Sequence, residues 1–299
     1  MTIAAKTLYD CIIIGAGPGG LQAAIYLGRY NRSILLIDRG AGRTTHAKRI
    51  ENYLTQKTIS GTDIVRIGME QARSFGAEII RGEVTSVRKN GSIFEVSTDT
   101  DTYAGSYVLV STGGKENIPE IENIYKFFAK TIVTCIDCDG YHFTGKKTVI
   151  IGNSIKSANL AMGMRDMYSK DITLVLCTDK LPDDYKEELR DEGIACVVGR
   201  PKRFLGSETV EAVEMADGTV ISCEMVMSHF GFKLNDQFLE GLNLKKESDH
   251  RTYQANRDFE SSLSGLYIVG PLCGHDQVVI AAGEGAIAAL DIKKRLLEM

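Results

Sequence analysis

The chain has 299 residues, 43% of them hydrophobic and 25% charged, a composition typical of a soluble globular protein of about two domains and not of a disordered chain. Its 35 basic and 39 acidic residues leave a net charge of −4, which argues against nucleic acid as a partner because phosphate binding needs clustered Lys and Arg. No apolar run reaches the roughly 18–20 residues of a membrane span, and the N-terminal segment lacks an apolar signal region, so we expect neither membrane insertion nor secretion.

The first predicted elements are a strand at residues 8–14, a glycine turn, a helix at residues 21–27 and a strand at residues 33–37 that ends in Asp38. The turn consists of Gly15, Ala16, Gly17, Pro18, Gly19 and Gly20. Glycines at its first, third and sixth positions match the dinucleotide fingerprint, in which they allow a tight turn, approach of a pyrophosphate and close helix packing. The helix N-terminus would face the pyrophosphate and Asp38 a ribose hydroxyl. FAD and NAD both fit this pattern, and a tight turn without ligand is the alternative.

The same strand–turn–helix–strand module is predicted a second time further along the chain. A helix at residues 62–75 and several short strands between residues 78 and 110 come first. A strand at 148–151 then ends at Gly152, and a helix at 157–167 and a strand at 172–176 follow. The last elements are a strand at 266–269, a turn at Gly270-Pro271 and a small-residue helix at 278–289. We therefore predict an α/β protein with two Rossmann-like domains, the second (residues 114–245) inserted into the first (1–113 and 246–299).

The segment Cys135-Ile136-Asp137-Cys138-Asp139-Gly140 carries the strongest chemical signal. Two cysteines three residues apart near a helix start can face the same side and close a small disulfide, and backbone donors there favour thiol–disulfide exchange. Asp139 is placed to give and take the proton that this chemistry moves. Seven cysteines, an odd number spread over a long chain, favour a reducing cytoplasm over a secreted disulfide framework. The alternatives are a zinc site made by the two cysteines and His142, and an unreactive pair.

With these motifs, the chain resembles the low-molecular-weight thioredoxin reductase family over nearly its whole length. The resemblance rests on the glycine loop, the segment GRTTHAKRIENY, the Ser-Thr-Gly at residues 111–113, the CIDCDG element and the segment AAGEGAIAA near the end. It implies two Rossmann-like FAD/NAD(P)-binding domains of the thioredoxin reductase or glutathione reductase type. It also implies FAD in the outer domain, a homodimer and a thioredoxin-like protein as substrate.

The resemblance also implies roles for individual residues. The glycine loop would hold the FAD pyrophosphate and Asp38 the ribose. Cys138 would be the sulfur next to the flavin, Cys135 the sulfur that exchanges with the partner disulfide, and Asp139 the acid and base. The other residues that the resemblance places at FAD are Asn52, Val84, Thr112, Gly113, Gly270, Gln277 and Val278.

Three departures distinguish this chain from the family pattern, two of them at the NADPH site of the second domain and one at the FAD ribityl chain. Ser154 replaces the second glycine of the NADPH loop, residues 176–179 read LCTD where the family has a His-Arg-Arg cluster, and Pro271 replaces an aspartate. These departures favour a branch similar to the pyridine-nucleotide-independent thioredoxin reductases, which include ferredoxin-linked and deeply rooted cyanobacterial enzymes, with a donor such as ferredoxin. One alternative is an NAD(P)H-dependent thioredoxin reductase in which Lys156 or Lys180 replaces the missing arginines. A non-catalytic flavin redox sensor is the other.

Overall fold

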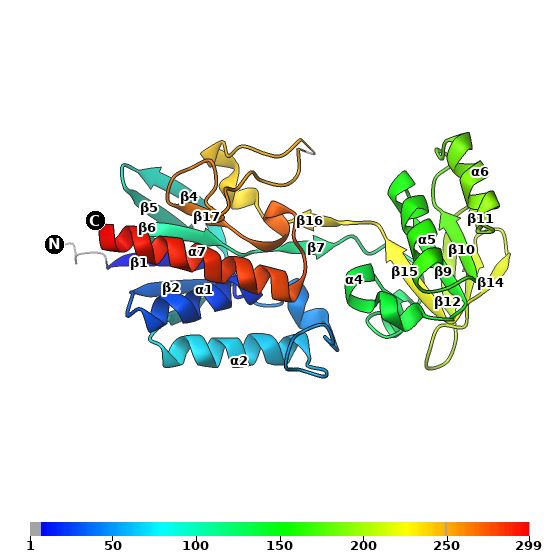
Figure 1. The fold of residues 1–299 in the computed structure, drawn as a ribbon, viewed down its shortest axis with the longest axis horizontal. Coiled ribbons are helices and arrows are strands. Elements are labelled where there is room, and N and C mark those ends of the chain that lie inside the picture. The colour runs from blue at the N-terminus through cyan, green and yellow to red at the C-terminus, as the bar shows by residue number, and fades with distance from the viewer. Residues whose placement is uncertain (1–6, 249, 299) are drawn as a thin grey trace. The chain divides into compact units, whose positions relative to one another are not determined.

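The computed structural model describes residues 7–248 and 250–298, and the chain divides into two compact units (Figure 1). The first unit contains the chain up to Lys115 and from Lys233 onward, and the second contains Glu116–Phe232. The chain therefore returns from the second unit to the first at Lys233, earlier than the predicted boundary at 245–246. The reason is a run of apolar side chains after the crossing, since Leu239 is buried and Leu234 and Phe238 pack with it in the core of the first unit.

A seven-stranded sheet forms the centre of the first unit. Its order is β3 (Glu78–Arg81), β2 (Ile34–Asp38), β1 (Leu8–Ile14), β6 (Thr102–Val110), β5 (Ile93–Thr98) and β4 (Val84–Asn90), and β17 (Leu266–Ile268) also pairs with β6. The strands β3, β2, β1, β6 and β17 pair parallel with one another, whereas β5 runs antiparallel to both β6 and β4. The carboxyl ends of the parallel strands therefore meet at one edge, and the strand order reverses between β1 and β6, where α/β sheets bind ligands.

The helices α1 (Pro18–Arg29), α2 (Gly61–Ser74) and α7 (Val278–Glu298) accompany this sheet (Figure 1), together with the short 3₁₀ helices η1 (Arg43–His46), η3 (Gln237–Leu242) and η4 (Gly270–Cys273). The predicted helices at 62–75 and 278–289 are confirmed, the second as a longer element. Small residues let α1 and α7 approach closely, because a Cβ atom on Gly285 would lie 2.0 Å from the carbonyl oxygen of Gly19. The start of α7 is therefore held against the glycine loop.

An ion network joins the C-terminal half of α7 to the sheet. The Arg295 guanidinium donates two hydrogen bonds of 2.7 Å to the Glu260 carboxylate and one of 2.8 Å to Asp291. The buried Tyr267 hydroxyl donates to the same Asp291 at 2.5 Å, and burial raises the pKa of this tyrosine. The two carboxylates depend on Arg295 for their compensating charge.

Replacing Arg295 with methionine is expected to lower the free energy of unfolding by about 2–3 kcal/mol, because it leaves two largely buried carboxylates without their cation. Chemical denaturation measures the change. The matched control is Arg66→Met, since Arg66 pairs with Asp63 and Glu70 on the exposed face of α2. We expect that variant to unfold at nearly the same denaturant concentration as the unaltered protein. Equal effects of the two substitutions would contradict the structural role of the network.

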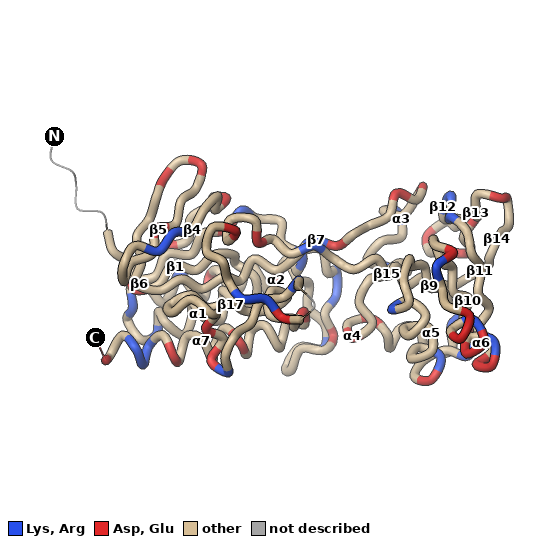
Figure 2. Tube along the Cα trace, turned by 90° about the horizontal axis from the view of Figure 1, so that it is seen from above, with Lys and Arg blue, Asp and Glu red and all other residues tan. Residues whose placement is uncertain are grey.

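The second unit has its own sheets. The five-stranded parallel sheet has the order β11 (Ala195–Val198), β10 (Ile172–Leu176), β9 (Thr148–Gly152), β15 (Met225–His229) and β8 (Ile132–Val133). An antiparallel sheet contains β12 (Pro201–Leu205), β13 (Ala212–Met215) and β14 (Val220–Ser222). The helices are α3 (Ile124–Phe127), α4 (Ile136–Asp139), α5 (Ile155–Met167) and α6 (Asp183–Asp191), with the 3₁₀ helix η2 (Gly140–Phe143) after α4. Figure 2 shows acidic residues along α6.

Two strands connect the units, β7 (Gly114–Glu116) on the way out and β16 (Phe232–Leu234) on the way back. They pair with each other.

Candidate functional site

The glycine loop lies where β1 ends and α1 begins, at the carboxyl edge of the first sheet. Gly15 has φ +98°, and a Cβ atom there would lie 2.6 Å from the Ser111 carbonyl oxygen, so only glycine fits. The Gly20 N–H donates to the Ser111 hydroxyl at 2.9 Å, which fixes the loop to the end of β6. Gly17 caps α1 without a side chain, Pro18 begins the helix and its first turn has no acidic residue. These features leave room for an anion at the helix N-terminus, and the residues fit a dinucleotide such as FAD.

Asp38, the last residue of β2, holds backbone groups in place at the carboxyl edge of the first sheet. Its Oδ1 accepts a hydrogen bond from the Ala16 N–H and its Oδ2 accepts one from the Gly40 N–H, both at 2.8 Å. Each carboxylate oxygen can accept a further hydrogen bond. Asp38 therefore holds the loop in place and can still accept from a ribose hydroxyl.

Two contacts between distant parts of the sequence complete this edge. The Asn52 side chain donates to Gln277 Oε1 at 3.1 Å, just before Val278 begins α7. The Thr112 hydroxyl donates to the Asn235 carbonyl at 2.6 Å, and the Asn235 side chain donates back to the Thr112 carbonyl at 2.9 Å. Sequence reasoning missed Asn235. Its only signal is its position directly after the strand that re-enters the first unit.

The remaining predicted residues of this unit occupy special backbone positions. Gly113 has φ +59° and accepts a hydrogen bond from the Asn235 N–H at 3.0 Å. Gly270 has φ +73°, and its N–H donates to the buried Glu284 carboxylate at 2.5 Å. Val84 begins β4, shortly after the carboxyl end of β3. The structure thus brings the glycine loop, Asp38, Thr112 and Gly270 to the ends of parallel strands, with Val84 beginning the antiparallel strand that follows β3.

The cysteine pair lies in the second unit, at the helix α4. Cys135 and Cys138 form a disulfide with a Cα–Cα distance of 5.3 Å, and Cys135 Sγ accepts a hydrogen bond from the Cys138 N–H at 3.1 Å. Cys135 is half-buried and Cys138 is exposed, and Asp139 ends the helix directly after Cys138. The disulfide binds both sulfurs covalently, so in this state they are not the zinc ligands that the alternative with His142 requires. The pair has the form that thiol–disulfide exchange needs.

Tyr168, which follows α5, explains the glycine after the cysteine motif. A Cβ atom on Gly140 would lie 2.8 Å from the Tyr168 ring. The Tyr168 carbonyl also accepts a hydrogen bond from the Gly145 N–H at 3.0 Å. Tyr168 is therefore a positioning residue for the segment that carries the disulfide, and no local pattern in the sequence pointed to it.

Burial raises the pKa of each of the five free cysteines. Cys11 and Cys223 are buried, and burial raises the pKa of both thiols, that of Cys223 to about 12. Burial also raises the pKa of Cys273 to about 12. Thiols with such pKa values are neutral near pH 7. The free thiols are therefore less suited to exchange chemistry than the Cys135–Cys138 pair.

The second unit has a Rossmann-type edge of its own where β9 meets α5. Ser157 Oγ and His229 Nδ1 are hydrogen-bonded at 3.0 Å, and a Cβ atom on Gly152 would lie 2.0 Å from the same serine oxygen. Burial, reinforced by the nearby Lys156, lowers the pKa of His229, which keeps its imidazole neutral near pH 7. Ser154 caps α5 without a side-chain hydrogen bond.

The positive charge of Arg200 acts at this edge from a distant part of the sequence. Burial raises the pKa of Cys177, the residue after β10, and the positive charge of Arg200 opposes that rise. Arg200 lies between β11 and β12. Its charge therefore acts near residues 176–179, which lack the arginine cluster of the family pattern.

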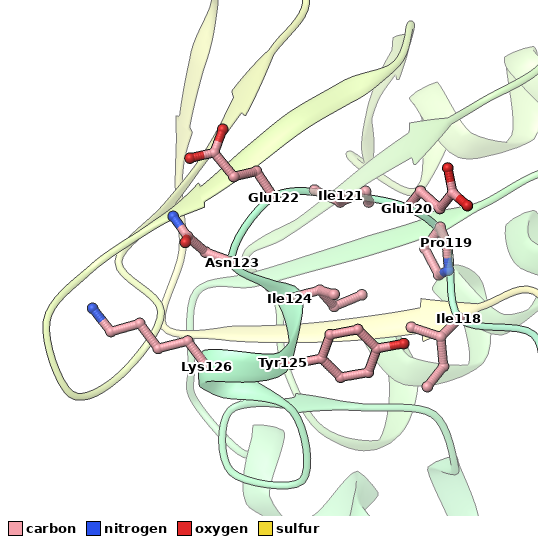
Figure 3. A pocket seen from close by; sticks show the side chains of 9 residues that line it. All are labelled: Ile118, Pro119, Glu120, Ile121, Glu122, Asn123, Ile124, Tyr125 and Lys126. Carbon is pink, nitrogen blue, oxygen red and sulfur yellow. The ribbon is translucent and has the colours of Figure 1, made fainter.

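A shallow pocket of about 480 Å³ lies elsewhere in the second unit (Figure 3). One segment, residues 118–126, lines it, and the ring of Tyr125 extends toward Ile118 (Figure 3). Its lining contains neither the cysteine pair nor the glycine-type loop. The pocket is therefore not a part of either candidate site.

Comparisons with known proteins agree with this geometry. Residues 9–286 match the family model described as pyridine nucleotide-disulphide oxidoreductase. Thioredoxin reductase of Bacillus subtilis is 26% identical over 98% of this chain and 96% of its own length, and that of Treponema pallidum is 28% identical over 95% and 96%. A crystal structure of thioredoxin reductase from Streptococcus pyogenes superposes with a TM-score of 0.90 at 24% identity, covering 99% of this chain and 100% of that one. The predicted α/β fold class is confirmed.

Within residues 7–248 and 250–298, none of the helices is long and apolar enough to cross a membrane.

Proposed function

The chain belongs to the pyridine nucleotide-disulphide oxidoreductase family, and from this we propose that it is an FAD-dependent dithiol–disulfide oxidoreductase that reduces a thioredoxin-like protein. The observation that carries the proposal is the Cys135–Cys138 disulfide on α4, in a chain whose other unit has a dinucleotide-type loop. The relatives named thioredoxin reductase support the class of substrate. We further propose that the protein works as a homodimer in the cytoplasm.

In this proposal the cysteines carry the exchange. Bound FAD supplies the electron pair that reduces the Cys135–Cys138 disulfide to two thiols. The Cys135 thiolate then attacks the disulfide of the partner protein and forms a mixed disulfide, releasing one partner thiolate. Cys138 attacks Cys135, which releases the second partner thiol and restores the disulfide on α4. Two electrons and two protons have then passed to the partner, and Asp139 holds and moves protons in these steps.

We propose that the electron donor is a protein such as ferredoxin and not NADPH. At the edge of the second unit, Ser154 takes the position at which a glycine lets a pyrophosphate approach the backbone. The end of β10 is followed by Asp179, whose negative charge disfavours a 2′-phosphate. These two features support a scaffold function for this unit.

An NAD(P)H-dependent thioredoxin reductase is the second candidate, and Arg200 favours it. Its positive charge acts on Cys177, and Lys156 lies in the first turn of α5 with its charge acting on His229. The two cations could together compensate a phosphate at this edge. The two candidates therefore differ in whether these charges hold a nucleotide.

An anaerobic reductant titration, followed by the visible absorption of the flavin, distinguishes the two candidates. We expect a large excess of NADPH to leave the flavin oxidised, whereas reduced ferredoxin or dithionite bleaches it. Arg200→Ala is the matched variant: it should leave both results unchanged. Rapid bleaching by stoichiometric NADPH, weakened in Arg200→Ala, would reject the proposed donor and establish the second candidate.

A further inference from the structure

Three side chains of metal-binding types converge in the first unit, at η4, at the turn after it and on α7. They are Cys273, His275 and Glu284, and their ligand atoms all lie within 4.8 Å of one another. Cys273 and His275 belong to the short segment before α7, and Glu284 is in the second turn of that helix. One sulfur, one nitrogen and one carboxylate oxygen form a donor set that suits Zn²⁺.

The distance between the Cys273 sulfur and one oxygen of Glu284 is close to that in a tetrahedral zinc site. Cys273 Sγ lies 3.8 Å from Glu284 Oε2, and ligands on one tetrahedral zinc ion, with Zn–S about 2.3 Å and Zn–O about 2.1 Å, lie about 3.6 Å apart. His275 Nδ1 lies 2.5 Å from Glu284 Oε1, which is a hydrogen-bond distance. Nitrogen and oxygen ligands of one tetrahedral zinc ion lie about 3.4 Å apart, so metal binding requires the imidazole nitrogen and the carboxylate oxygen to separate by about 0.9 Å. The His275 side chain is 52% exposed, so it has room to move and leaves a path for an ion to enter.

Glu284 is the buried member of this cluster. Its side chain is 4% exposed, and a buried carboxylate needs a compensating charge or several donors. Its hydrogen-bond partners are the Gly270 N–H at 2.5 Å, His275 and the Cys273 thiol. In the described part of the chain, no lysine or arginine forms an ion pair with it. The Gly270 N–H orients the carboxylate, as outer hydrogen bonds do in known metal sites.

We propose that Cys273, His275 and Glu284 bind one Zn²⁺ ion, with a water molecule as the fourth ligand. Binding displaces the proton of the Cys273 thiol to solvent and forms one Zn–S, one Zn–N and one Zn–O bond. The ion ties the segment between Gly270 and Gln277 to α7. This inference does not rest on the proposed redox function, because it concerns only the association of a metal ion with the folded chain.

The test uses the oxidised, flavin-loaded protein, in which the disulfide keeps Cys135 and Cys138 from binding metal. Zinc is added at micromolar concentration, unbound metal is removed by gel filtration, and zinc per chain is measured by elemental mass spectrometry. We expect one zinc per chain and a melting temperature that rises with zinc concentration. Cys273→Ala and His275→Ala should each weaken zinc binding at least tenfold, as even outer-shell changes do by about 10–100-fold.

The matched control is Cys196→Ala, which removes an exposed thiol from β11 and should not change the affinity. Because the two variants alter half-buried or exposed side chains and leave Glu284 in place, we expect both to fold, which the flavin spectrum checks. Absence of zinc from the unaltered protein, or unchanged affinity in either variant, would overturn the proposal and leave a hydrogen-bonded cluster in its place.

Discussion

Replacing Cys138 with serine is expected to lower the turnover of a thioredoxin-like disulfide by about 10³-fold or more, as removal of a reacting group does in other covalent mechanisms. Cys135 keeps its thiol in this variant and can still attack the partner, but no second thiol is present to resolve the product. A stable mixed disulfide should therefore accumulate. Non-reducing electrophoresis followed by mass spectrometry detects it, and turnover is measured in parallel with the unaltered protein.

Two further variants make the result interpretable. Cys196→Ser removes an exposed lone thiol and should retain full turnover. Cys135→Ser should lose turnover without trapping the partner. If Cys135→Ser alone traps the partner, then Cys138 is the sulfur that attacks the partner and Cys135 is the sulfur that resolves the product. The greater exposure of Cys138 would explain that result. Failure of both variants to trap, together with no turnover by the unaltered protein, would favour a redox sensor.

The second large effect is expected at the contact between α1 and α7. In Gly285→Ala the new methyl group would lie 2.0 Å from the Gly19 carbonyl oxygen and 2.9 Å from its Cα, and neither backbone atom can move alone. The two helices must separate, which displaces the glycine loop. We expect the free energy of unfolding to fall by about 3 kcal/mol and the purified protein to retain little FAD. Chemical denaturation and the ratio of flavin to protein absorption measure the two effects.

Gly283→Ala is the control on the same helix. A Cβ atom at this position meets no atom within 4 Å, and the residue is exposed. Alanine restricts the unfolded chain more than glycine does, so this variant should be more stable by about 0.5–1 kcal/mol and keep its flavin. Equal losses in the two variants would contradict the close packing of α7 on the glycine loop.

Much of the site could be predicted from local sequence. The glycine loop and Asp38 lie within one strand–turn–helix–strand module, and the cysteines within four residues, so neighbours in the sequence are neighbours in space. The pairing of Asn52 with Gln277, 225 residues apart, has no such local signal. The hydrogen bond between Thr112 and Asn235 and the close approach of the Tyr168 ring to Gly140 have no local signal either.

The sequence by itself determined the two Rossmann-type modules and the Cys135–Cys138 disulfide pair, because turns, helix starts and small disulfides depend on residues a few positions apart. Only the tertiary structure decided where the second crossing lies, since Leu234, Phe238 and Leu239 could have packed in either unit and join the core of the first. It also lets the charge of Arg200 act on Cys177, and it brings the ligand atoms of Cys273, His275 and Glu284 within 4.8 Å of one another. Such contacts arise when whole elements pack against each other, and the chain positions involved share no periodicity that a linear pattern could reveal.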